Sequence, residues 1–349
     1  MGGERSTVTT DVSALRRLTT EIFAAAGCSP AEASIVADDL VTADQMGLHS
    51  HGTLRIKEYL AALGQGRLRS GGDCAVVAER GAAILVDGGA GFGQVVGRFA
   101  VDVGIERARS HGTSCVVTRN SFHIGRMGAL IERVVASEMI CLAAIAVDLP
   151  GQVAPWGSTE GTLSTNPIGY GVPLADGRVV ADFATSAMAG GAIALALRDG
   201  RSLPEGIIVT SDGDPTTDPA ELFADPPGAI LPIGGPVGYK GFALNLLPEL
   251  VAAGLAGYGP NDPTRSNNCL FLVVVDPSAF LPVARFRQLA SESARLVTGA
   301  RPRSGCEVML PGEREDRASQ ENRERVDLSA AAVDDLRQAA KRLGVNVSL

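Results

Sequence analysis

The sequence is poor in lysine, histidine and aromatic side chains. Its 349 residues include only three lysines, four histidines and one tryptophan, and aromatic residues make up 4%. Acidic side chains outnumber basic ones by 39 to 31, so the net charge is −8. A chain of this charge, with no basic segment carrying interleaved aromatic residues, is poorly suited to bind a phosphate backbone. We therefore expect no nucleic-acid partner.

The sequence also lacks a long apolar run. Its longest apolar segments, 139–147 and 269–275, are well short of the roughly 18 residues that suggest a membrane helix. They are typical of buried strands. The first eleven residues are polar and lack the apolar core of a signal peptide. These features predict a cytoplasmic protein with no membrane partner.

The six cysteines show no CxxC spacing. Cys115 and Cys141 lie inside apolar, strand-like runs. This distribution predicts buried free thiols in a reducing compartment, and it favours neither a disulfide framework nor a zinc site.

The histidines that are present are grouped. Three of the four fall in two short polar clusters, HSHG at 49–52 and NSFH at 120–123. Histidine has an ordinary pKa of about 6.5, so its charge changes near physiological pH. Clusters that combine it with hydroxyl and amide side chains are typical of acid-base catalysis, which predicts an enzyme.

The first cluster precedes an amphipathic pattern that predicts a helix from Ser50 to about residue 64. On such a helix His51, Arg55 and Tyr59 are four residues apart and share one side. An imidazole, a guanidinium and a phenol together suit a small carboxylate ligand. The alternative is an ordinary helix, with Arg55 paired to Glu58 and Tyr59 at the edge of the core.

Residues 74–118 alternate between strand and helix patterns around a glycine-rich turn at 88–93. This arrangement raises the possibility of a dinucleotide-binding Rossmann fold. However, the last glycine of GFGQVVG (91–97) comes one residue too late for GxGxxG, and the next strand ends without a ribose-binding acid. The Rossmann fold therefore stays an alternative.

The second cluster follows the predicted strand 114–118. A helix that begins near residue 124 would place His123 in its first turn, where the helix dipole disfavours an imidazolium. The next predicted strand, 140–147, ends at Asp148, which could orient His123. The alternative is that Asp148 is a capping residue before Pro150.

Seven short motifs occur in order along nearly the whole chain. They are SHGTLRIKEY (50–59), NSFHIG (120–125), STNPI (164–168), ADFATS (181–186), GDPTTDP (213–219), KGFAL (240–244) and LPGE (310–313). Together they resemble the motifs of the type-2 malate/L-lactate dehydrogenase family. That family also contains ureidoglycolate and sulfolactate dehydrogenases and reductases of cyclic imine carboxylates.

The resemblance implies hydride transfer between NAD or NADP and C2 of a small 2-hydroxy or 2-oxo acid, or of a cyclic imine carboxylate. It implies that His123 is the acid-base residue and Asp148 its partner. It assigns the carboxylate substrate to Ser50, His51, Arg55 and Tyr59. It assigns the cofactor to Ser121, Asn166, Ala181, Asp182, Phe183, Lys240, Gly312, Glu313 and Arg314. No metal is expected.

The resemblance further implies an α/β (α+β) fold. This fold has two parts. One is a family-specific, non-Rossmann NAD(P)-binding domain with a largely antiparallel sheet, and the other is a helical lobe made from both chain ends. Residues 1–120 together with 286–349 are expected to form the helical and mixed α/β lobe for substrate and dimer contacts. Residues 121–285 are expected to form the NAD(P)-binding domain. The family implies a homodimer.

The chain departs from the family pattern at several positions. Met46 replaces a frequent arginine, Tyr239 a usual histidine, and Ser164 a glycine. Trp156 either marks an unusual substrate or belongs to the core. Two other classes stay open: a metal-dependent hydrolase that uses His49 and His51, and an inactive nucleotide-binding protein.

Overall fold

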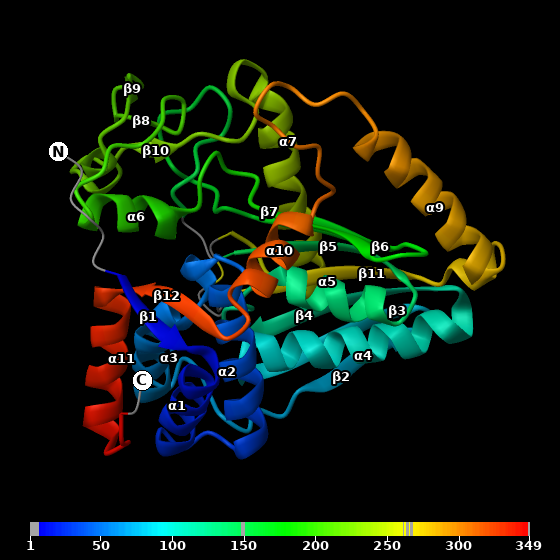
Figure 1. Ribbon diagram of the computed structural model, residues 1–349, viewed down its shortest axis with the longest axis horizontal. Coiled ribbons are helices and arrows are strands. Elements are labelled where there is room, and N and C mark those ends of the chain that lie inside the picture. Colours follow the sequence, from blue (N-terminus) through cyan, green and yellow to red (C-terminus); the bar gives the residue numbers. More distant parts are fainter. Residues whose placement is uncertain (1–6, 148–150, 261, 263–264, 266–267, 348–349) are drawn as a thin grey trace.

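The computed structural model describes residues 7–147, 151–260, 262, 265 and 268–347 (Figure 1). The strands are β1 (Thr7–Asp11), β2 (Ala75–Arg80), β3 (Ala83–Gly91), β4 (Thr113–Ser121), β5 (Ile140–Ala146), β6 (Ile168–Pro173), β7 (Arg178–Phe183), β8 (Ile208–Val209), β9 (Pro215–Thr216), β10 (Ala229–Ile230), β11 (Cys269–Val275) and β12 (Arg325–Ser329). The α-helices are α1 (Val12–Ala25), α2 (Pro30–Gln45), α3 (Ile56–Gly64), α4 (Gly93–His111), α5 (Met127–Ala136), α6 (Gly190–Arg198), α7 (Tyr239–Pro248), α8 (Gly254–Ala256), α9 (Val283–Thr298), α10 (Glu313–Glu321) and α11 (Ala330–Leu343).

The centre of the molecule is a seven-stranded sheet in the order β2-β3-β4-β11-β5-β6-β7. Only β3 and β4 pair in parallel, joined by α4, and every other pair in this sheet is antiparallel. The predicted largely antiparallel α/β fold is confirmed. The Rossmann alternative is wrong, because that fold requires a mostly parallel sheet.

Helices α4 and α5 cover one face of this sheet and bury a continuous apolar core (Figure 1). On the opposite face, the segment from α7 to α8 covers strands β4, β5 and β11 through small residues such as Ala252 and Ala256. The remainder of that face leaves Leu142, Tyr170 and Phe183 exposed. The sheet is therefore only half covered on this side.

The two ends of the chain meet in a helical lobe. Helices α1, α2, α3 and α11 pack around side chains that include Leu15, Phe23 and Leu336, and β1 pairs with β12. Ser29 and Glu32 form a complete capping box at the start of α2, as the sequence predicts. A helical lobe from both ends is thus confirmed.

A smaller region formed by α6 and the short sheet β10-β8-β9 has its own apolar cluster, which includes Ile193, Ile208 and Ile230. The sequence did not predict this region. The domain division at residues 120/121 and 285/286 stays a prediction, and the central sheet takes strands from both sides of residue 120. Among the described residues, no helix is both long and apolar enough to span a membrane.

Two predicted helix starts are wrong. Residues 49–55 form two short 3₁₀ turns, His49–His51 and Thr53–Arg55, and α3 begins only at Ile56. The backbone at Gly52, between the turns, is extended (φ −91°, ψ −155°) and interrupts the helix. Helix α5 begins at Met127, so His123 lies before its first turn.

Candidate functional site

A buried carboxylate organises the first histidine cluster. Asp44, on α2, accepts hydrogen bonds from the Thr53 N–H (2.8 Å) and the Thr53 hydroxyl (2.7 Å). Its Oδ1 also lies 3.0 Å from Nδ1 of His49. A Cβ at Gly52 would lie 2.0 Å from the same Oδ1, so only glycine fits there. The sequence did not assign a role to His49. Its contact with Asp44 helps to stabilise this turn.

The second cluster lies beside the first. A Cβ at Gly93 would come within 2.4 Å of the carbonyl oxygens of Phe122 and His123, so α4 starts directly against this segment. The Ile124 N–H donates to the Asn268 side chain over 2.9 Å. The His51 and His123 rings are stacked, with centroids 5.9 Å apart and planes 21° apart. The fold thus brings together two clusters that are distant in sequence.

Tyr59 lies between His123 and the apolar core of the helical lobe. Its hydroxyl is 2.7 Å from Nδ1 of His123 and accepts a 2.9 Å hydrogen bond from Nε2 of Gln94. The Tyr59 side chain is fully buried and its ring meets that of Phe122 edge-on, 5.5 Å away. The Tyr59 hydroxyl therefore makes hydrogen bonds within the protein, to His123 and Gln94. Substrate binding by Tyr59 stays a prediction.

Arg55 is held by its own segment. Its Nε donates to the Ser50 carbonyl over 2.8 Å, and its Nη1 lies 2.5 Å from Oε2 of Glu58. An ion pair between Arg55 and Glu58 is what we expected if residues 50–64 form an ordinary helix without a substrate site. Arg55, Ser50 and Glu58 nevertheless line a cavity of about 270 Å³, whose other wall is α6 with Gly191 and Arg198. This size suits a small organic acid.

Both stacked histidines are held in the neutral form. Burial, followed by the nearby Arg55 and Arg126 charges, lowers the pKa of His51 to about 4. Burial, followed by Arg55 and His51, holds the pKa of His123 well below its usual value. From the sequence we expected the dipole of a following helix to disfavour the charged form of His123. Helix α5 begins only at Met127, so the lowered pKa of His123 is due to burial and nearby charge. A neutral imidazole is ready to accept a proton.

Two residues assigned to the cofactor by resemblance are buried and bonded to protein backbone. The Ser121 hydroxyl donates to the Phe122 carbonyl over 3.1 Å. Asn166 accepts from the Val147 N–H (3.1 Å) and donates to the Asn245 carbonyl (3.0 Å). Asn166 therefore anchors the end of β5. Asp148, the predicted partner of His123, lies outside the described residues.

Other assigned cofactor residues meet at the edge of the sheet. The chain at 310–313 lies against β7, where the Val180 N–H donates to the Pro311 carbonyl over 3.0 Å. Gly312 has φ +95°, and a Cβ there would lie 3.0 Å from the Val180 carbonyl oxygen. A cavity of about 450 Å³ opens between them, lined in part by Ala181, Asp182, Phe183, Gly312 and Glu315. Residues about 130 positions apart thus share one cavity.

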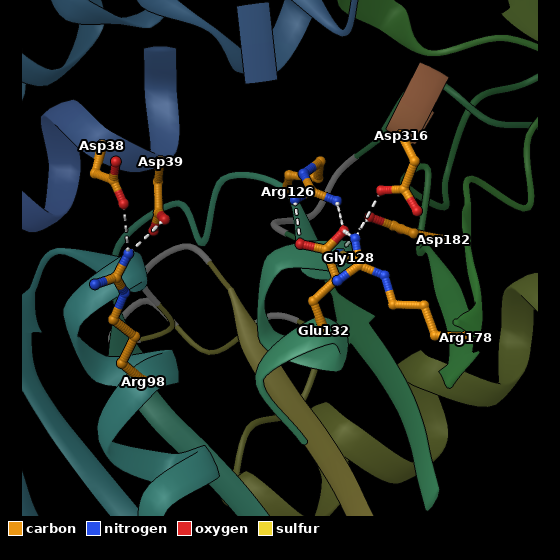
Figure 2. A network of polar contacts seen from close by, with 9 residues as sticks. All are labelled: Asp38, Asp39, Arg98, Arg126, Gly128, Glu132, Arg178, Asp182 and Asp316. Atoms are coloured by element: carbon orange, nitrogen blue, oxygen red, sulfur yellow. Dashed lines mark hydrogen bonds and ion pairs between the residues drawn. The ribbon is translucent and has the colours of Figure 1, made fainter. Parts of the chain in front are cut away.

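Charged side chains brace the wall of this cavity (Figure 2). Arg126 binds Glu132 through two hydrogen bonds of 3.0 and 2.7 Å. Arg178 links Glu132 (3.4 Å) to Asp316 (2.7 Å), and Asp182 accepts from the Gly128 N–H over 2.6 Å. Burial raises the pKa of Asp182. Arg126 was not predicted from the sequence, although it follows the second cluster by only three residues.

Lys240 and Arg314 are exposed and are not among the described residues that line this cavity. The Lys240 Nζ lies 5.9 Å from the centre of the Tyr239 ring, which meets Trp156 edge-on at 6.3 Å. Trp156 is 47% exposed, so it does not belong to the core. Its indole packs instead against Gly238, two residues before Lys240. A Cβ at Gly238 would lie 2.5 Å from the indole.

In the described part of the chain, no group of three or more His, Cys, Asp or Glu side chains could hold a metal ion. His49 is bonded to Asp44, and His51 Nδ1 lies 3.1 Å from the Ser50 hydroxyl. The HxH pattern therefore brings no further metal ligands together among these residues.

Comparison with known sequences gives nearly full-length matches. The family model described as malate/L-lactate dehydrogenase matches residues 10–337. The L-sulfolactate dehydrogenase of Methanocaldococcus jannaschii is 32% identical over 339 residues, with 95% of this chain and 96% of the relative covered. The L-lactate dehydrogenase of Cupriavidus necator is 33% identical over 345 residues, covering 96% of this chain and 98% of the relative.

Solved structures agree with these matches. The sulfolactate dehydrogenase from Methanocaldococcus jannaschii superimposes with a TM-score of 0.88 at 31% identity, covering 97% of this chain and 98% of the other. The delta1-piperideine-2-carboxylate reductase from Pseudomonas syringae superimposes with a TM-score of 0.82 at 31% identity, covering 96% and 100%.

Proposed function

Because the chain belongs to the malate/L-lactate dehydrogenase family, we propose that it transfers a hydride between NAD or NADP and C2 of a small 2-hydroxy or 2-oxo acid. The observation that carries this proposal is the neutral, half-buried His123, which is stacked on His51 within the influence of the Arg55 charge. Such a histidine suits proton exchange with a hydroxyl or carbonyl oxygen that bears a neighbouring carboxylate.

In this proposal Arg55 binds the carboxylate of the substrate, and Ser50 and His51 hydrogen-bond to the same molecule. Nε2 of His123 takes the proton of the substrate hydroxyl during oxidation and returns it during reduction. Asp148 is proposed to stabilise the charged imidazole. Exclusion of water by the buried walls around His51 and His123 strengthens each of these polar contacts.

The residues around β7 fit a dinucleotide, because Gly312 leaves room against Val180 and the cavity beside them falls within the usual size range for ligands. The bound nicotinamide supplies or accepts the hydride. In this proposal Ala181, Asp182, Phe183 and Gly312, which line the cavity, would hold the cofactor, and Lys240, Glu313 and Arg314 would contact it from outside the cavity. Ser121 and Asn166, whose side chains are buried and bonded to backbone, would support the site.

A second candidate is reduction of a cyclic imine or ketimine carboxylate. It is supported by the likeness to the piperideine carboxylate reductase. The same residues would serve it, since a C=N group needs a hydride at carbon and a proton at nitrogen.

A spectrophotometric screen tests both candidates. Oxidation of NADH and of NADPH should be followed with a panel of 2-oxo acids and cyclic imine carboxylates, and NAD⁺ and NADP⁺ reduction with 2-hydroxy acids. We expect turnover with one of these classes. Nucleotide binding without turnover of any compound would instead indicate an inactive binding protein.

We also propose a cytoplasmic homodimer. Leu142 is exposed on the uncovered part of the sheet, outside the cavity that Tyr170 and Phe183 line, and gives a surface suited to a second copy of the chain. Residues 1–120 with 286–349 are proposed to provide the substrate and dimer lobe, and 121–285 the NAD(P)-binding domain. The six cysteines are all free, in keeping with a reducing compartment.

A further inference from the structure

We propose that Gln94 and Tyr59 are positioning residues that determine which nitrogen of His123 carries hydrogen, and that their hydrogen bonds reverse when Nδ1 of His123 takes up a proton. This inference rests on the proposed function, in which His123 is the proton carrier. Neither Gln94 nor its contact with Tyr59 was anticipated from the sequence motifs.

The three side chains form one chain of hydrogen bonds that comes from three elements. Gln94 is in the first turn of α4, Tyr59 is on α3, and His123 follows β4. Gln94 is 1% exposed and Tyr59 is 0% exposed. The distances are 2.9 Å from Gln94 Nε2 to the Tyr59 hydroxyl, and 2.7 Å from that hydroxyl to Nδ1 of His123.

The donors and acceptors fix the hydrogen positions in this arrangement. Gln94 Nε2 donates to the Tyr59 oxygen, so the single Tyr59 hydrogen is directed to Nδ1 of His123. The Gly125 N–H also points to Nδ1, over 3.3 Å. Nδ1 is therefore an acceptor, and in the neutral ring the hydrogen is on Nε2.

The proposed chemistry needs the opposite arrangement. During oxidation the substrate O–H bond breaks and its proton bonds to Nε2 of His123, while the C2–H bond breaks and its hydrogen leaves with the electron pair, as hydride, to the oxidised nicotinamide of the cofactor. Nε2 must therefore begin without hydrogen, so Nδ1 must carry one and donate it to Tyr59. The ring reaches this state when Nδ1 takes up a proton from solvent and Nε2 releases its own to solvent. The Tyr59 hydroxyl then has to donate elsewhere.

Gln94 provides the acceptor for that state. Its Oε1 is buried and has no hydrogen-bond partner among the described residues, which is costly for an amide oxygen. Rotation of the terminal amide exchanges Nε2 and Oε1 with almost no change of shape. After rotation, Nδ1–H donates to the Tyr59 oxygen and the Tyr59 hydroxyl donates to Oε1. The unused oxygen is thus explained by the second state of the relay.

The hydrogen on His123 can be observed directly by ¹⁵N NMR of histidine-labelled protein. There are only four histidines, and the His123 signals are those lost in His123→Asn. We expect the neutral wild-type ring to carry its hydrogen on Nε2. Gln94→Glu, whose ionised side chain only accepts, should move the hydrogen to Nδ1. The same tautomer in both proteins would overturn the proposal.

Kinetics and pH profiles provide the second test. Gln94→Leu should lower kcat for oxidation by about 10- to 100-fold, with KM and nucleotide affinity little changed, and Tyr59→Phe should lower kcat by a similar factor. Gln94→Glu should restore part of the loss seen in Gln94→Leu, and should move the acidic limb of the kcat profile to higher pH. Unchanged rates and pH profiles in Gln94→Leu would contradict a positioning role.

Phe23→Leu is the matched control. Phe23 lies against Tyr59 in the same core, with ring centroids 6.3 Å apart, but belongs to no part of the relay. We expect lower stability with an unchanged His123 tautomer and pH profile. If His123→Asn itself retains turnover, the proposed function fails. If His123→Asn is inactive and Gln94→Leu is normal, only the relay fails.

Discussion

At the scale of single residues, the site depends on burial and neighbouring charge more than on residue type. His51 and His123 share one environment, in which burial and Arg55 favour the neutral ring. The fourth histidine, His111, lies exposed at the end of α4, with its Nδ1 3.2 Å from the Arg107 carbonyl oxygen. One residue type thus has distinct roles at different positions.

We predict that His123→Ala lowers turnover by at least about 100-fold, because no other group would exchange the proton of the substrate. Cofactor affinity, measured by quenching of protein fluorescence or by calorimetry, should stay close to wild type. The assignment of His123 would be wrong if the variant turned over at a near-normal rate.

We predict two effects for Arg55→Leu. Loss of a charge-assisted hydrogen bond to the substrate should raise KM by about 10-fold or more. Loss of the positive charge should also raise the pKa of His123 and shift the acidic limb of the activity profile to higher pH. Glu58→Gln is the control, since it removes the partner of Arg55 and keeps the guanidinium. An Arg55→Leu enzyme with unchanged KM would exclude the carboxylate-binding role.

Stability should depend on pH through His51. Its folded pKa of about 4 is below the usual 6.5, so the unfolded chain binds more protons between these values. This stabilising contribution is complete above pH 6.5 and is lost as the pH falls toward 4, by up to about 1.4 kcal/mol per pH unit. Urea unfolding of wild type and His51→Gln should show a smaller pH dependence in the variant. His111→Gln should behave like wild type.

At the scale of elements, a single carboxylate holds the segment between α2 and α3 in short turns, where the sequence predicts a regular helix. Asp44 binds the Thr53 N–H and hydroxyl and so holds the chain in two short 3₁₀ turns. Gly52 makes this possible because it has no Cβ to meet the carboxylate. The turns direct His51 toward His123, with which it stacks.

Gly52→Ala should therefore be costly. The added methyl would lie 2.0 Å from Asp44 Oδ1, and we expect a loss of about 1–3 kcal/mol in the free energy of unfolding together with lower activity. Gly64→Ala, at the end of α3 where nothing lies within 4 Å, is the matched control. Equal stabilities for the two variants would show that the contact between Asp44 and Gly52 does not constrain the turn.

At the scale of the whole molecule, a half-covered sheet joins a helical lobe made from both chain ends (Figure 1). The two candidate cavities lie at different edges of this framework, one against α6 and one between β7 and α10. The arrangement leaves Leu142 of β5 exposed outside both cavities. We expect a second copy of the chain to bury it.

Leu142→Glu should weaken that association. Leu142 is 51% exposed on β5, and a carboxylate there would have to be desolvated in a dimer. Sedimentation velocity should show a shift from dimer to monomer at micromolar concentration. Val77→Glu, on the edge strand β2 at the far side of the sheet, should leave the assembly unchanged. A wild-type protein that is monomeric would contradict the proposed dimer.

The sequence by itself determined the elements whose signals are local. The capping box at Ser29 and the strand Cys269–Val275 were predicted correctly, because caps and apolar runs act within a few residues. The ordered motifs identified the family, and the family model confirms it. The roles assigned to individual site residues remain predictions.

Only the tertiary structure decided what depends on distant partners. Asp44 holds Thr53, so the helix expected from Ser50 begins only at Ile56, and Gln94 joins Tyr59 and His123 from another helix. These contacts connect residues brought together by packing, so no local pattern shows them. The role of His123 as a proton carrier is a prediction from the sequence, whereas its preference for the neutral form depends on burial and on Arg55 in the folded protein.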